Sequence, residues 1–142
     1  MTIRRLVPLL LLASACGNST GLGPPPLKAG TYALVSIAGA PLPAPEPCTG
    51  VRTEAARIVV NDARGVEFHY RGVRPATGEV VTATATGSYT TRFDGRVHLS
   101  LSYTGTPGYT ASQLMQRTEN GLEEIAGLPC DGRDVKLYRY QP

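Results

Sequence analysis

Along most of the chain beyond residue 29, apolar residues alternate with polar ones, as they do in strands that bury one face. The alternation divides into short segments separated by turn residues such as Asp94-Gly95. It predicts eight strands, at residues 30–37, 52–60, 66–73, 79–91, 96–103, 109–118, 122–126 and 135–140. Residues 119–125 also have helical character, so a short helix is an alternative to the last hairpin, whose centre would be Asn120-Gly121.

Eight short antiparallel strands fit a small up-and-down barrel, because closure removes the exposed sheet edges. We therefore expect an all-β domain over residues 29–142. In the first strand Tyr32 and Leu34 share one face and Ile37 falls on the other, and Gly87 in the long strand permits tight curvature. The candidate barrel interior consists of large side chains on the inward faces: Tyr70, Tyr89, Leu99, Leu101 and Tyr103.

Composition and charge narrow the function classes. The 142 residues include 16 Gly and 12 Pro, which disfavours a helical bundle. The formal charge of +3 comes from Arg4, Arg5 and Lys28, since the chain from Ala29 onward has 11 basic and 11 acidic residues. A neutral domain gives no electrostatic case for binding nucleic acid.

The N-terminus has the features of a secretion signal. Residues 1–5 are positive, residues 6–12 are mostly apolar, and Ala13-Ser14-Ala15 is a small-residue cleavage site. Residues 12–16 resemble the bacterial lipobox, which implies that Cys16 carries fatty acyl chains such as palmitate. Gly17 after the cysteine then implies the outer membrane, on the periplasmic side or at the surface. Cleavage at Ala15 by the ordinary signal peptidase is the alternative. Residues 16–28 would form a flexible tether.

Two cysteines remain if Cys16 is lipidated. Cys48 and Cys130 have no metal ligand at short spacing, and an oxidising compartment favours a disulfide between them. In an eight-strand meander the first and last strands are neighbours. Cys48 follows the first strand and Cys130 precedes the last, so we expect both at one rim, near the seam. Two buried free thiols are the alternative.

A resemblance extends loosely over most of the chain. After the lipobox and the tether, the pattern GxYxLxSIxGxxLP from Gly30 to Pro43 resembles the opening of small bacterial lipocalin-like lipoproteins of uncharacterised function. Residues 87–99 resemble their middle hairpin and residues 137–140 their closing strand. Because these motifs concern packing and turns, the resemblance implies the fold more than the function.

Candidate catalytic and metal motifs are weak. Residues 17–21 match the pattern Gly-x-Ser-x-Gly but lie in the tether, where the strand and helix of a nucleophile elbow are missing. His69 and His98 lie on strands separated by another strand. Asp131 and Asp134 are too few for a calcium site. We interpret Glu119, Glu123 and Glu124 as a solvated hairpin edge. We therefore expect no metal, no cofactor and no enzymatic activity.

Two hypotheses remain for the function. In the first, a lipid-anchored barrel in the cell envelope binds an apolar or amphipathic small molecule. In the second, a packed barrel presents its rim loops, residues 40–47 and 104–108, to another envelope protein, as an interaction or inhibitor module. An empty interior favours the first hypothesis and a filled one the second.

Overall fold

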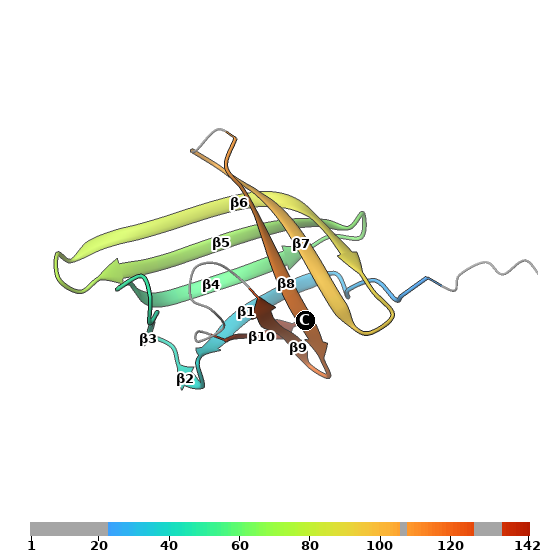
Figure 1. Ribbon diagram of the computed structural model, residues 1–142, viewed down its shortest axis with the longest axis horizontal. Coiled ribbons are helices and arrows are strands. Elements are labelled where there is room, and N and C mark those ends of the chain that lie inside the picture. The colour runs from blue at the N-terminus through green and yellow to red at the C-terminus, as the bar shows by residue number, and fades with distance from the viewer. Residues whose placement is uncertain (1–22, 106–107, 127–134) are drawn as a thin grey trace, which may run out of the picture.

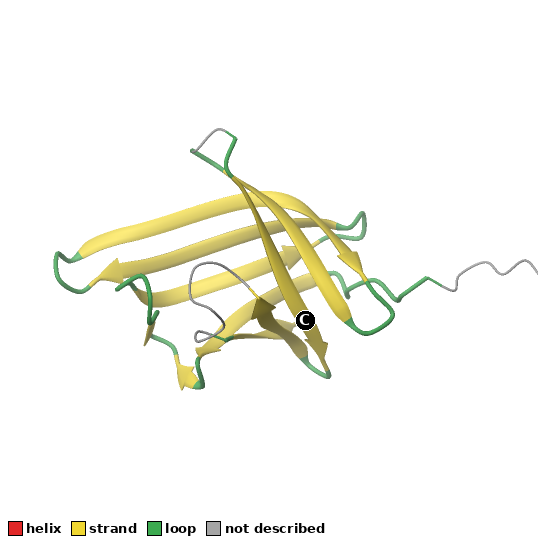
Figure 2. Ribbon diagram, in the orientation of Figure 1, coloured by secondary structure: helices red, strands yellow, loops and turns green. Residues whose placement is uncertain are grey.

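The computed structural model describes residues 23–105, 108–126 and 135–142, and in these residues all regular structure is β-strand (Figures 1 and 2). None of the described segments forms a helix of the length and hydrophobicity that a membrane crossing requires. The eight long strands are β1 (Gly30–Ile37), β4 (Arg52–Val60), β5 (Gly65–Arg74), β6 (Glu79–Thr91), β7 (Arg96–Tyr103), β8 (Thr110–Thr118), β9 (Gly121–Ala126) and β10 (Lys136–Gln141). Two short strands, β2 (Ala40–Pro41) and β3 (Ala44–Pro45), lie between β1 and β4.

The eight long strands close into an antiparallel barrel. Each strand from β4 to β10 pairs with the next one, and β1 pairs with both β10 and β4. The predicted closed barrel of eight strands is therefore confirmed. Residues 119–120 form the turn of a β8–β9 hairpin, so the prediction of a hairpin rather than a helix is also confirmed. Gly121 is not part of that turn and begins β9.

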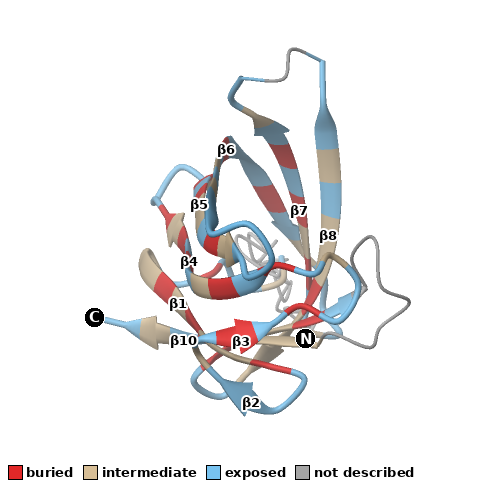
Figure 3. Cartoon of the chain, turned by 90° about the vertical axis from the view of Figure 1, so that its left-hand side faces the viewer, coloured by how far each residue is buried: buried red, intermediate tan, exposed pale blue. Residues whose placement is uncertain are grey.

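The alternation seen in the sequence corresponds to the inside and outside of the barrel. Buried and exposed residues alternate along β7, where Val97, Leu99 and Leu101 are buried (Figure 3). The first strand departs from simple alternation at a β-bulge between Leu34 and Ser36. A bulge places two residues opposite one and reverses the faces beyond it. Ile37 consequently joins Leu34 in the core, which corrects its predicted position on the other face.

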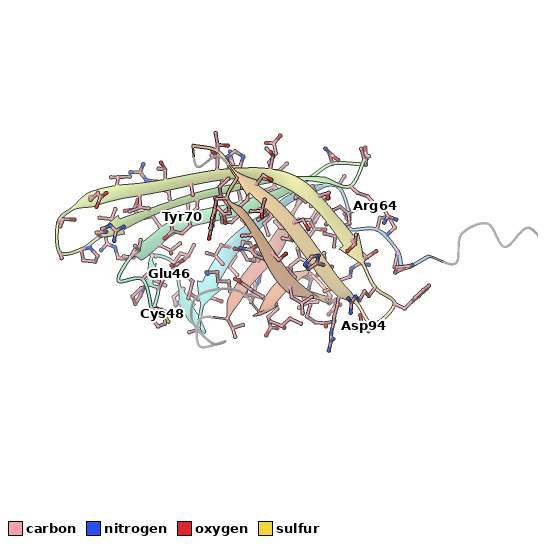
Figure 4. The ribbon with its side chains drawn as sticks, turned by 45° about the horizontal axis from the view of Figure 1, so that its top comes forward. Glu46, Cys48, Arg64, Tyr70 and Asp94 are labelled. Atoms are coloured by element: carbon pink, nitrogen blue, oxygen red, sulfur yellow. The ribbon has the colours of Figure 1, made fainter. Side chains whose placement is uncertain are left out.

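The two ends of the barrel differ. We call one the tether end; it consists of the turns at 61–64, 92–95 and 119–120 and of segment 24–28, which enters the barrel there. We call the other the open end; it includes segment 38–51 and the turn at 75–78. This turn is the tip of the β5–β6 hairpin, which projects beyond the rest of the barrel (Figure 1). Figure 4 shows Arg64 and Asp94 at the tether end and Glu46, Cys48 and Tyr70 toward the open end.

The last part of the expected tether packs against the barrel. Leu27 is a member of the hydrophobic core, and its backbone N–H donates a hydrogen bond to the Tyr89 hydroxyl at 3.1 Å. The Thr91 hydroxyl donates to the Pro24 carbonyl at 3.3 Å. These contacts hold residues 24–28 against the tether end of the barrel.

Candidate functional site

A cavity of about 320 Å³ occupies the open end of the barrel. We call it the open-end cavity. Its volume lies at the small end of the range of ligand sites in proteins, roughly 300–1,000 Å³. Its apolar wall consists of Leu34, Val51, Ala56, Phe68, Val81 and Ala83. Its polar lining consists of Glu46, Thr49, Tyr70, Arg74, Tyr103, Gln113, Lys136 and Tyr138.

The candidate interior residues all belong to one cluster but not all reach the cavity. Tyr89, Leu99 and Leu101 are buried in the core, and Tyr70 and Tyr103 pack against it half-buried. Only Tyr70 and Tyr103 line the open-end cavity. The three buried residues fill the barrel beneath it. The interior is therefore filled in one part and hollow in another.

Glu46 is the centre of the polar side of the cavity. It follows β3 and is almost completely buried. Its carboxylate accepts hydrogen bonds from the hydroxyls of Thr49 at 2.9 Å and Thr53 at 3.0 Å. The Thr53 hydroxyl also lies 3.2 Å from the Tyr70 hydroxyl. Because each group is fixed by a neighbour, the polar side is held in place before any ligand binds.

Lys136 lines the cavity and lies near two buried carboxylates. Its Nζ lies 3.8 Å from Glu46 Oε1 and 3.6 Å from Glu124 Oε2. The interpretation of Glu124 as a solvated residue is therefore wrong. On β9 the inward positions are Leu122 and Glu124, whereas Ile125 faces outward and is 40% exposed. Lys136 thus places a positive charge beside each of these buried carboxylates. Arg74 also lines the cavity and pairs with Glu79, its Nε 3.0 Å from Glu79 Oε2.

The side-chain oxygen of Gln113 is a further polar group of the cavity. Gln113 lies on β8 opposite Leu99, in an inward position, and lines the cavity. Its Oε1 is buried and has no hydrogen-bond partner within the part of the chain that the structure describes. A buried acceptor without a partner destabilises the fold by about 1–3 kcal/mol. A ligand N–H or O–H group would recover this energy.

The tyrosines near the cavity remain neutral well into the alkaline range. Burial raises the pKa of the Tyr70 and Tyr103 phenols. Burial, with the Glu124 and Glu46 carboxylates nearby, raises the pKa of Tyr138 well above its ordinary value. At neutral pH these phenols are hydrogen-bonding groups without charge.

The buried phenol of Tyr138 predicts a loss of stability at high pH. Above about pH 10 the unfolded chain releases this proton while the folded chain retains it, so stability falls as pH rises. In that range this proton lowers the free energy of unfolding by about 1.4 kcal/mol for each pH unit. We expect Tyr138→Phe to remove this contribution to the slope. Urea unfolding between pH 9 and 11 measures it, with the exposed Tyr109→Phe as control. Equal slopes in the two variants would contradict the burial of this phenol.

The other candidate residues do not meet at this site. His69 and His98 lie on β5 and β7 with β6 between them. No group of three potential metal ligands occurs among the described residues. Cys16, Cys130, Asp131, Asp134 and the pattern at 17–21 lie outside the described residues. Glu119 is exposed at the β8–β9 turn.

Sequence reasoning missed three residues of the site. Gln113 could have been found, because it occupies an inward position two residues before Met115 on β8. Lys136 and Glu46 carried no signal, because the ion pair forms between segments ninety residues apart in the sequence. Comparisons of the chain with known protein families, with curated proteins and with solved structures find no match.

Proposed function

We propose that this protein is a non-catalytic, lipid-anchored protein of the cell envelope that binds a small amphipathic molecule in the open-end cavity. The observation that carries the proposal is a cavity of about 320 Å³ at one end of a closed barrel, with an apolar wall and a polar side. The wall would hold the apolar part of the ligand. Gln113 Oε1 favours a ligand head that donates a hydrogen bond.

The alternative role as an interaction module has less support. That role needs rim loops that stand free of the barrel. In segment 40–47, Ala44 and Glu46 are buried and Leu42 packs against the core. The segment therefore lines the cavity mouth more than it projects from it. Part of the other rim loop, residues 104–108, lies outside the described residues.

The anchor is proposed from the sequence, where Cys16 follows the secretion signal in a lipobox-like context. The resemblance to lipocalin-like lipoproteins supports an acylated Cys16 and the outer membrane as the location. Segment 24–28 enters at the tether end, opposite the cavity. A barrel anchored through Cys16 would thus present its cavity away from the membrane surface, toward molecules in the surrounding compartment.

We also propose the Cys48–Cys130 disulfide at the rim of the open end. Two contacts support it by joining the neighbouring segments. The Ala38 N–H donates to the Val135 carbonyl at 2.8 Å. Glu46, two residues before Cys48, forms the ion pair with Lys136, six residues after Cys130. A disulfide there would connect the segment after β1 to the segment before β10.

Filling the cavity tests the proposed function. Ala83 lines the cavity from β6, and Thr84 is the next residue and faces outward. We expect Ala83→Phe to weaken binding of the neutral fluorescent amine N-phenyl-1-naphthylamine at least tenfold, since the new ring would occupy the ligand's space. Thr84→Phe is the matched control and should bind as the unmodified chain does. Equal binding by both variants would place the probe elsewhere and contradict the proposal.

A further inference from the structure

A second pocket, of about 330 Å³, lies at the tether end. We call it the tether-end pocket. It is bounded by residues 26–28, by the β8–β9 turn and by the rings of Tyr32 and Tyr140. The Tyr32 hydroxyl donates to the Lys28 carbonyl at 3.0 Å, and the Tyr140 hydroxyl donates to the Ala29 carbonyl at 3.0 Å. These two bonds fix the segment that forms one side of the pocket.

Two cations face this pocket without a carboxylate within ion-pair distance among the described residues. Arg117 donates from Nη2 to the Pro25 carbonyl at 2.8 Å, and its buried Nε has no acceptor in the described part of the chain. Lys28 Nζ lies 4.3 Å from the centre of the Tyr140 ring. Glu119 also lines the pocket, so the pocket has one positive charge in excess.

A buried guanidinium N–H without an acceptor indicates that a ligand completes the site. Guanidinium groups bind phosphate through paired, charge-assisted hydrogen bonds, and a nearby ammonium adds a point charge. We propose that the tether-end pocket binds the phosphate of an anionic phospholipid, so that this end of the barrel rests on a membrane. This site is separate from the open-end cavity and does not depend on its function.

The surroundings of the pocket favour a lipid as the source of the phosphate. Phe93, at the β6–β7 turn, is 79% exposed. The same turn contacts Arg117, whose backbone N–H donates to the Gly95 carbonyl at 2.9 Å. An exposed aromatic ring beside cations is typical of a surface that inserts at a membrane interface.

The length of the tether is consistent with this placement. Pro24 is bound at the tether end, where its carbonyl accepts the Thr91 hydrogen bond. Cys16 precedes it by eight residues in the sequence. An extended chain of that length spans at most roughly 28 Å. An acylated Cys16 would therefore hold the tether-end pocket and Phe93 close to the lipid headgroups.

The test uses the absence of tryptophan from the chain. In the chain from Gly17 onward, which contains every strand of the barrel, Phe93→Trp creates a single fluorescent reporter. We expect its emission to shift to the blue with vesicles of phosphatidylcholine and phosphatidylglycerol, and not with phosphatidylcholine alone. Arg117→Gln and Lys28→Gln should each weaken partition about fivefold. Arg71→Gln, which removes the same charge from an exposed position on β5, should not.

Three outcomes would overturn the proposal. One is equal partition into both kinds of vesicle. Another is equal weakening by Arg117→Gln and Arg71→Gln, with far-UV circular dichroism establishing that each variant is folded. If Arg117→Gln does not fold, the same comparison is made with Lys28→Gln. The third is NMR binding of inorganic phosphate that requires Arg117, at matched ionic strength, without partition into vesicles, which would assign the pocket to a soluble phosphate.

Discussion

Replacing Gly87 or Gly121 by alanine is expected to destabilise the barrel by at least about 3 kcal/mol and to lower its melting temperature by more than about 10 °C. A Cβ atom at Gly87 would overlap the backbone carbonyl oxygen of Ser100 on the neighbouring strand β7. At Gly121 it would overlap the carbonyl oxygen of Tyr138 on β10. Because both obstacles are backbone atoms in a closed sheet, a rotation of a side chain cannot relieve them.

Thermal unfolding followed by circular dichroism measures this effect in the chain from Gly17 onward. Gly23→Ala is the matched control, since no atom lies within 4 Å of a Cβ built there. The control should melt with the unmodified chain. If the melting temperature of Gly87→Ala were also within about 2 °C of that of the unmodified chain, β6 and β7 would not approach each other as closely as the barrel requires.

Loss of the proposed Cys48–Cys130 disulfide is the other large expected effect. The bond would close a loop of about 83 residues, and the chain-entropy treatment gives roughly 4.5 kcal/mol for a loop of that size. That is a large fraction of the stability of a small domain. We expect Cys48→Ser and Cys130→Ser each to lower the melting temperature by several degrees or more. The double variant should lose no more than either single one, because both remove the same bond.

Melting with and without reductant provides an independent check. The chain from Gly17 onward lacks Cys16, so only these two cysteines remain. Reductant should lower the melting temperature of the unmodified chain to that of the variants and should not affect the variants. Equal stability in both conditions would mean that the two cysteines are not paired.

The strands of this fold were predictable because each depends on a local pattern. Alternation of apolar and polar residues placed all eight, and Asp94-Gly95 marked the turn between β6 and β7. The position of Ile37 was not predictable, because a bulge at Leu34 depends on pairing with β10, which is distant in the sequence. The pattern predicts curvature at Gly87, but it does not predict that the Ser100 carbonyl comes so close, because that contact depends on the local bend of the paired strands.

The candidate site was less predictable than the fold. The half-buried Tyr70 and Tyr103 were found from their inward positions. The polar side of the cavity was not predicted, because buried charged residues leave no periodic pattern in a sequence. The pattern indicated a surface position for Glu124. The burial of Glu124 is explained by Lys136, whose Nζ lies 3.6 Å from Glu124 Oε2. The docking of residues 24–28 was missed for a similar reason, since a proline-rich segment is typical of a free linker.

Native mass spectrometry tests the central claim, that the open-end cavity holds a small molecule, most directly. The chain from Gly17 onward would be secreted into the periplasm and purified without detergent. We predict an additional mass that disappears on denaturation and is lost in Ala83→Phe but retained in Thr84→Phe. A mass equal to that of the polypeptide alone, less the two hydrogens lost in forming the disulfide, would contradict the account. That result would favour a role through the rim loops.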